Sequence, residues 1–104
     1  MIDKILGRHV FVFALMALSI SPALAGDPVK GREIYIEYCS GCHGLEGVPQ
    51  VGEIPNFSLG QGLNKSDRDL LIYMKKGSDI MPAYEGVLTD REILDVIAHL
   101  RTLF

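Results

Sequence analysis

The stretch Cys39-Ser40-Gly41-Cys42-His43 decides which fold and chemistry are expected of this 104-residue chain. Two cysteines are separated by two residues, and a histidine follows directly. Such a pattern fits a redox dithiol, half of a zinc site, or the covalent attachment point of a haem. The remainder of the sequence discriminates among these three.

Haem attachment is favoured because the other two kinds of site lack their remaining parts. The sequence has no third cysteine, and its other histidines are His9 and His99, so a four-ligand zinc site is poorly supported. A thioredoxin-like dithiol would accompany alternating strands and helices, and none are visible. An exported disulfide would leave the adjacent histidine unexplained. We therefore expect one covalent haem c, with thioether bonds to Cys39 and Cys42 and with His43 as an axial iron ligand.

The first 25 residues have the pattern of a secretory signal peptide. Lys4 and Arg8 precede an apolar run over residues 10–20, and small residues lead to Ala25. This run is shorter than the ~20 residues that span a bilayer, although an uncleaved membrane anchor is the alternative. We expect cleavage after Ala25, which would leave residues 26–104 as one periplasmic domain.

The composition of residues 26–104 limits the possible partners. The whole chain has a formal charge of −3, and without Asp3, Lys4 and Arg8 it keeps eight basic and twelve acidic residues, a charge of −4. An acidic domain is a poor partner for nucleic acid, which requires a basic face. A domain this small buries a modest fraction of its surface and is often supported by a disulfide, a metal or a cofactor.

A short helix is expected to lead into the cysteine motif. Asp27 is a suitable N-cap and Pro28 suits the first helical position, so the helix should run from about Pro28 to Cys39. Gly31 inside it is either tolerated near the helix start or required by the close approach of another helix. The apolar side of this helix would consist of Ile34, Tyr35 and Tyr38.

Two further helices are expected downstream. Ser66 with Asp69 forms an approximate capping box, and Gly77 suits the end of that helix. Thr89 with Glu92 forms a regular capping box for the last helix. Apolar residues recur at helical spacing in both segments, namely Leu70, Leu71 and Met74, then Ile93, Val96, Ile97, Leu100 and Phe104. No strand pattern competes, so the sequence predicts an all-α fold with three main helices and loops around one haem.

The intervening segment, residues 44–65, is rich in glycine and is expected to form a loop. A loop of this length inside a small domain is unusual unless it encloses a ligand. Its apolar residues Val48, Val51, Ile54, Phe57 and Leu59 give it side chains to bury, and a haem would provide the surface for them.

The second axial position of the iron has several candidate ligands. Met74 lies on the apolar stripe of a helix and His99 lies within the last helix, so both are expected to serve in packing. Met81 instead follows a glycine-containing turn and precedes Pro82, which stiffens the loop. We expect Met81 to bind the iron opposite His43, the alternative being a five-coordinate or exchangeable site, with water or a lysine as weaker candidates.

The order of "CSGCHG", "IPNF", "IMPAY" and "LTDREILDVIAHLR" resembles a small class I cytochrome c over residues 27–104. The resemblance implies that the first and last helices cross at Gly31. It also implies that the Pro55 carbonyl accepts the proton of the His43 ring nitrogen not bound to iron. Two departures are the absence of tryptophan and the presence of His99 where relatives usually carry Tyr or Phe.

The segment from Pro55 to Leu103 is further similar to the small periplasmic cytochromes encoded beside cytochrome cd-type nitrite reductase. That resemblance implies a monomeric one-electron carrier, not an enzyme, with the reductase as a redox partner. The alternative is a haem-binding assembly factor in maturation of the d-type haem, and a small peroxidase is a weaker third. Lys75 and Lys76 near Met81 are candidates for a local positive charge on the docking face.

Overall fold

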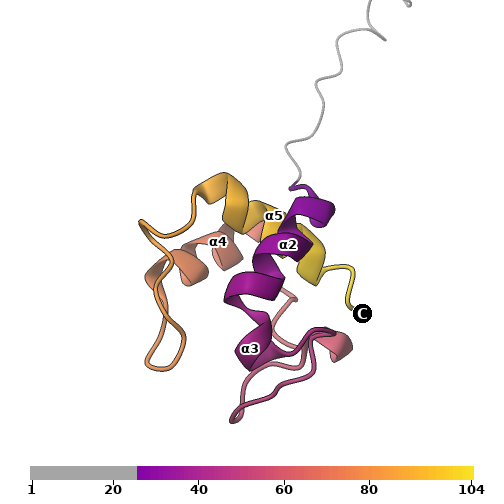
Figure 1. Cartoon of the computed structure of the whole chain (residues 1–104). Helices are drawn as coiled ribbons and strands as arrows, with labels where there is room; N and C mark the ends of the chain where they lie inside the picture. Colours follow the sequence, from indigo (N-terminus) through magenta and orange to yellow (C-terminus); the bar gives the residue numbers. More distant parts are fainter. Residues whose placement is uncertain (1–25) are drawn as a thin grey trace, which may run out of the picture.

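The structure, a computed structural model, describes residues 26–104, and the expected signal peptide lies outside the described residues (Figure 1). Helical elements follow one another without any strand in the described chain: α2 (Pro28–Tyr38), α3 (Ser40–His43), the 3₁₀ turn η1 (Phe57–Leu59), α4 (Asp67–Lys76) and α5 (Asp90–Leu100). The predicted all-α fold is confirmed. The first helix ends at Tyr38, one residue earlier than expected, and the cysteine motif continues into the separate turn α3.

The crossing of α2 and α5 depends on Gly31, as the family resemblance implied. A Cβ atom added there would collide with the Asp95 carbonyl oxygen and would lie 2.8 Å from the Val96 nitrogen. The two helices therefore approach backbone to backbone, which only glycine permits at this position. The close contact between them is visible where α2 passes in front of α5 (Figure 1).

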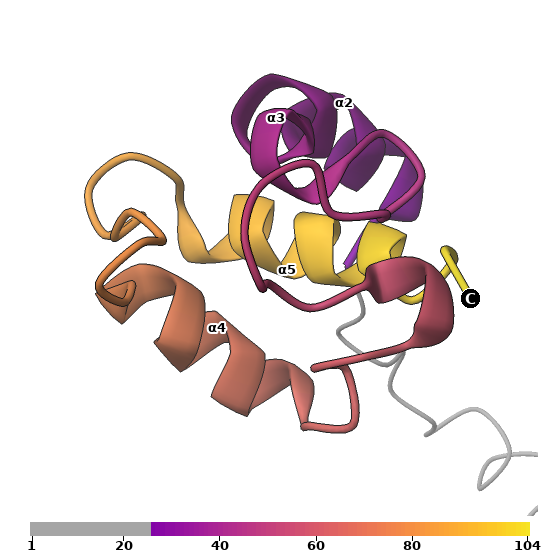
Figure 2. The same ribbon diagram turned by 90° about the horizontal axis from the view of Figure 1, so that it is seen from below.

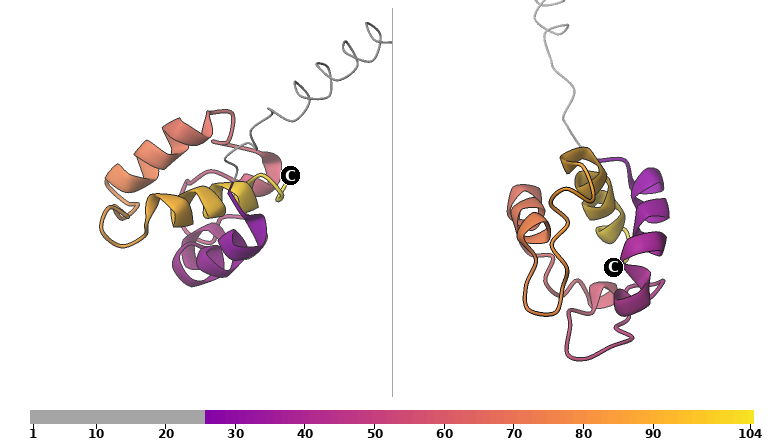
Figure 3. Two further views of the ribbon diagram at one scale, coloured as in Figure 1. Left: turned by 90° about the horizontal axis from the view of Figure 1, so that it is seen from above. Right: turned by 60° about the vertical axis from the view of Figure 1, so that its left-hand side comes forward.

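Helix α5 lies between α2 and α4 and contacts both (Figures 2 and 3). The core comprises Tyr35, Cys39, Phe57, Leu63, Leu70, Met74, Tyr84, Leu88, Ile93, Val96, Ile97 and Leu100. The apolar stripes expected on the helices are confirmed, except for Tyr38 and Phe104 at the ends of two of them. Tyr38 is 41% exposed, and Phe104 is 63% exposed because α5 ends at Leu100 and the chain leaves the helical path.

Side-chain caps fix the helix starts where the sequence placed them. The Asp27 carboxylate accepts a hydrogen bond from Val29 N at 2.9 Å, and Ser66 Oγ accepts one from Asp69 N at 3.1 Å. Thr89 and Glu92 make both bonds of a capping box. Each cap satisfies amide groups that would otherwise lack a helical partner.

The loop over residues 44–65 buries less than expected. Phe57 is buried and Ile54 is half-buried, whereas Val48, Val51 and Leu59 are exposed. Protein atoms therefore cover two of the five apolar side chains, and burial of the other three against the haem stays a prediction. Among residues 26–104, no helix is long and apolar enough to cross a membrane.

The end of this loop is held by Arg101, which follows α5. Its guanidinium donates to the carbonyl oxygens of Leu63 and Lys65, each at 2.8 Å. It also donates from Nε to Asp67 Oδ1 at 2.9 Å. One side chain thus ties the loop and the start of α4 to the end of α5.

Candidate functional site

The cysteine motif forms one helical turn at the end of α2. Cys39 N donates to Tyr35 O, and His43 N donates to Cys39 O, both at 2.9 Å. Cys39 is buried in the core and Cys42 is exposed, and no disulfide joins them. Burial, and secondarily the neighbouring Cys42, raises the pKa of the Cys39 thiol to about 11. The turn therefore presents two sulfurs three positions apart, with the imidazole directly after the second, on one short segment.

The His43 ring is half-buried and stacks on Phe57, with ring centroids 4.5 Å apart and planes inclined by 20°. Its Nδ1 atom is buried and has no hydrogen-bond partner among the described residues. The bond to the Pro55 carbonyl implied by the family resemblance is therefore not made. Burial lowers the pKa of His43, which favours the neutral imidazole that binds metals.

Met81 and Met74 occupy different environments. Met74 is 5% exposed within the core, which confirms its expected packing role. Met81 is half-buried and packs against the same core from the loop after α4. Its iron-binding role stays a prediction.

Backbone bonds close the loop that carries Met81. Ser78 N donates to Met81 O at 2.9 Å, and Met81 N donates to Ser78 Oγ at 3.3 Å. The loop begins at Gly77, whose φ of 72° is rarely open to other residues. Tyr84 N then donates to Met74 O at 3.0 Å, which returns the chain to the end of α4. The loop is thereby closed on itself between Ser78 and Met81 and tied back to α4 at Tyr84.

Tyr35 and Tyr84, for which the sequence predicted no role in the site, join its parts by hydrogen bonds. Tyr35 OH donates to Gly44 O at 2.6 Å, directly after the cysteine motif. Tyr84 OH donates to Tyr38 O at 3.0 Å and so joins the Met81 loop to α2. Burial raises the pKa of Tyr35 to about 12 and also raises that of Tyr84. The available signal was their aromatic rings beside apolar stripes, since a buried tyrosine hydroxyl usually requires a partner.

His99 is a packed residue, as expected from its place in the last helix. It is 6% exposed, and its ring lies 5.1 Å from that of Tyr35 at an angle of 57°. Its Nε2 atom is buried without a partner in the described chain. Burial, with a further contribution from Arg32, lowers its pKa.

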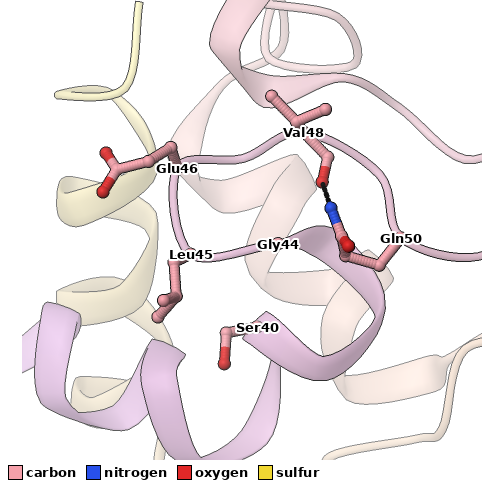
Figure 4. A pocket seen from close by; sticks show the side chains of 6 residues that line it. All are labelled: Ser40, Gly44, Leu45, Glu46, Val48 and Gln50. Atoms are coloured by element: carbon pink, nitrogen blue, oxygen red, sulfur yellow. Dashed lines mark hydrogen bonds between the residues drawn. The ribbon is translucent and has the colours of Figure 1, made fainter.

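An open pocket of about 440 Å³ lies beside the motif (Figure 4). Gln50 Nε2 donates to the Val48 carbonyl at 3.1 Å on one side of it, while Glu46 points away from the other labelled side chains (Figure 4). The lining residues are Ser40, Gly44, Leu45, Glu46, Val48 and Gln50. None of the four predicted haem residues lines this pocket, although Ser40 belongs to the cysteine motif and Gly44 follows it.

The residues brought together fit a covalently attached haem. Cys39 and Phe57 belong to one apolar cluster, and Met81 packs on that same cluster. His43 stacks on Phe57, and its Nδ1 is left buried without a partner among the described residues. One cysteine sulfur, the His43 imidazole and the Met81 thioether therefore contact one apolar region, and the sulfur of Cys42 is exposed one helical turn from that of Cys39. This donor set suits a c-type haem.

Comparisons with known proteins agree with this fit. A family model described as "Cytochrome C oxidase, cbb3-type, subunit III" matches residues 26–100. Cytochrome c6 of Nostoc sp. (strain PCC 7120) is 32% identical over 97 residues, covering 91% of this chain and 84% of its own. Cytochrome c6 of Thermosynechococcus vestitus is 31% identical over 98 residues, covering 88% of each chain. Cytochrome c of Tetrahymena pyriformis is 28% identical over 98 residues, covering 75% of this chain and 90% of its own.

Fold, site and matches together define a monohaem electron-carrier domain. The chain belongs to the class I c-type cytochrome family and carries one covalent haem c. It is an electron carrier and not an enzyme, as the sequence predicted.

Proposed function

We propose that the chain is exported to the periplasm and acts there as a monomeric one-electron carrier. Cys39 and Cys42 would hold the haem, with His43 and Met81 as the iron ligands. The observation that carries the proposal is that Cys39 lies in one apolar cluster on which Met81 packs. The signal-like pattern before Ala25 supports export.

The surrounding residues suit reversible electron transfer with little rearrangement. A bound haem supplies the one-electron iron couple, and a histidine–methionine ligand pair raises its reduction potential. Ser78 closes the Met81 loop with one backbone and one side-chain hydrogen bond, and Tyr84 N ties its end to Met74 O. A loop fixed in this way would hold the thioether in place in both redox states and would deny substrates an open iron position.

A respiratory reductase such as cytochrome cd-type nitrite reductase is the proposed partner, supported by the resemblance of residues 55–103 to cytochromes encoded beside it. The sequence suggested that Lys75 and Lys76 give the docking face a positive charge, but Lys75 is paired with two carboxylates. Lys75 Nζ lies 2.9 Å from Asp90 Oδ1 and 3.4 Å from Glu85 Oε2, so its charge is largely compensated locally. Lys76 is the remaining candidate of the pair. The rate of electron transfer between such proteins should depend on salt, and the complex that they form should be weak.

Substitution at the two methionines tests the ligand assignment. Met81→Ala should abolish the sulfur-to-iron charge-transfer band of the oxidised protein, admit exogenous ligands and lower the potential. Met74→Ala is the matched control: it should keep the band and lose ~2–5 kcal/mol of stability through a core cavity. Retention of the band in the Met81 variant would contradict the assignment.

Stopped-flow mixing of the reduced protein with oxidised nitrite reductase tests the carrier role. Fast and saturable oxidation that slows or accelerates with added salt is expected. Negligible oxidation, combined with tight binding of free d-type haem, would favour the assembly factor. Deletion of the coding sequence separates the two roles again, because loss of an assembly factor leaves reductase without its d-type haem.

A further inference from the structure

Asp95 is a carboxylate buried in the middle of α5, where it is 4% exposed. Burial of a carboxylate is costly unless hydrogen bonds or an opposite charge compensate it. Its Oδ1 accepts a hydrogen bond from Asp27 N at 2.7 Å, across 68 positions of sequence. The chain immediately before α2 is therefore held against the side chain of Asp95.

Gly26 is seated against the same turn of α5. A Cβ atom added to it would collide with the Leu94 carbonyl oxygen and would lie 2.9 Å from Asp95 N. Gly26 and Asp95 also line one pocket of about 320 Å³. Because consecutive backbone nitrogens lie within about 4 Å of each other, the Gly26 nitrogen is one short step from the nitrogen that Asp95 binds.

We propose that Asp95 is the receptor for the α-ammonium group that export processing creates at Gly26. Hydrolysis of the Ala25–Gly26 peptide bond by water leaves a carboxylate on Ala25 and an ammonium on Gly26. A neutral amide thereby becomes a cation beside a buried anion, and the ion pair fastens the mature N-terminus to α5. The inference rests on the proposed cleavage after Ala25 and goes beyond the carrier function.

Other charged groups near Gly26 also act on the α-amine. Lys30 and Arg91 line the pocket as cations, and Asp27 adds a second carboxylate. The pairing with Asp95 should raise the pKa of the α-amine above its ordinary ~7.7–8.0. A base with a raised folded-state pKa stabilises the protein below its ordinary pKa, and that stability is lost as pH rises through the raised value.

The test compares exported holoproteins in a double-mutant cycle. One change inserts Gln-Ser after Ala25, which moves the free amine two residues away from Asp95 while keeping its charge. The other is Asp95→Asn, with Asp69→Asn on the exposed face of α4 as a matched control. The insertion should lower the thermal midpoint in the parent and in the Asp69 variant, and should have no effect in the Asp95 variant. NMR titration of the α-amine should give a raised pKa in the parent and an ordinary one in the Asp95 variant.

Equal effects of the insertion in all three backgrounds, or an unshifted α-amine pKa in the parent, would overturn the proposal. If the Asp95 variant does not fold, the thermal midpoint of the insertion variant and the α-amine pKa of the parent still test the proposal. Mass spectrometry of the exported protein examines processing separately. A start other than Gly26 would overturn the inference and would leave the assignments of His43 and Met81 untouched.

Discussion

At Gly31 the absence of a side chain sets how closely α2 and α5 approach. The Asp95 carbonyl and the Val96 nitrogen occupy the place where a Cβ would lie. Gly41 in α3 is a contrasting helical glycine, since nothing lies within 4 Å of an added Cβ there. Alanine substitution at these two positions therefore distinguishes the cost of a steric clash from the effect of helix propensity.

Gly31→Ala should destabilise the holoprotein by about 1–3 kcal/mol or more, because rigid backbone must move. Gly41→Ala should be neutral or stabilising by up to ~1 kcal/mol, the gain of alanine over glycine in a helix. Denaturant unfolding followed by far-ultraviolet circular dichroism measures both. Equal effects at the two positions would contradict the steric account.

His99 should make the stability depend on mildly acidic pH. Burial foremost, and then Arg32, lowers its pKa from the ordinary 6.5, so the unfolded state binds the proton more readily. Stability is therefore fully present above about 6.5 and declines as pH falls through that value toward the folded-state pKa. His99→Phe should flatten the pH dependence of the unfolding free energy in this range. An unchanged slope would show that His99 titrates equally in both states.

At the scale of elements, capping residues set the starts of α2, α4 and α5, and Arg101 joins elements that are distant in sequence. The Arg101–Asp67 ion pair is at the surface, with side chains 33% and 52% exposed, so its Coulomb contribution is small. The two bonds to the Leu63 and Lys65 carbonyls carry most of the attachment. The guanidinium geometry, more than its charge, is therefore what the loop requires.

Arg101→Ala should cost about 1–3 kcal/mol of unfolding free energy, the range of hydrogen bonds made by a charged donor. Arg101→Lys should recover only part of this, since an ammonium group lacks the planar set of donors that a guanidinium presents. Arg68→Ala on the exposed side of α4 should stay within ~0.5 kcal/mol of the parent. Full recovery by lysine, in equilibrium unfolding of all three variants, would assign the effect to charge instead.

At the scale of the whole molecule, α5 is the element on which the others assemble. It lies between α2 and α4 (Figure 3), and it contributes Ile93, Val96, Ile97 and Leu100 to the core. In a domain this small, helices are stable mainly through such tertiary packing. The apolar cluster beside the cysteine motif therefore depends on α5 even though α5 supplies no proposed haem ligand.

Removal of the chain from Thr89 onward should prevent accumulation of a stable holoprotein. Removal of Phe104 alone, which is 63% exposed, is the control and should leave the spectrum and thermal midpoint nearly unchanged. Visible spectroscopy and thermal unfolding of the exported proteins measure both. A truncated protein with the parent's spectrum and midpoint would show that α5 is peripheral.

Local features of the fold were predictable from the sequence. The caps at Asp27, Ser66 and Thr89, the end of α4 at Gly77, and the single CxxCH motif each involve residues within about one helical turn. Their physical causes are local: amide groups that need partners and a glycine that tolerates positive φ. Apolar spacing likewise predicted which faces of α4 and α5 are buried.

The tertiary structure alone decided the contacts between distant segments. His43 stacks on Phe57 and does not bond the Pro55 carbonyl, Lys75 pairs with Glu85 and Asp90, and Arg101 reaches back to Leu63. Asp27 and Asp95 meet across 68 positions of sequence. No local pattern encodes these pairs, because they arise only after helix packing has fixed which side chains share a space and which polar groups are left to be satisfied.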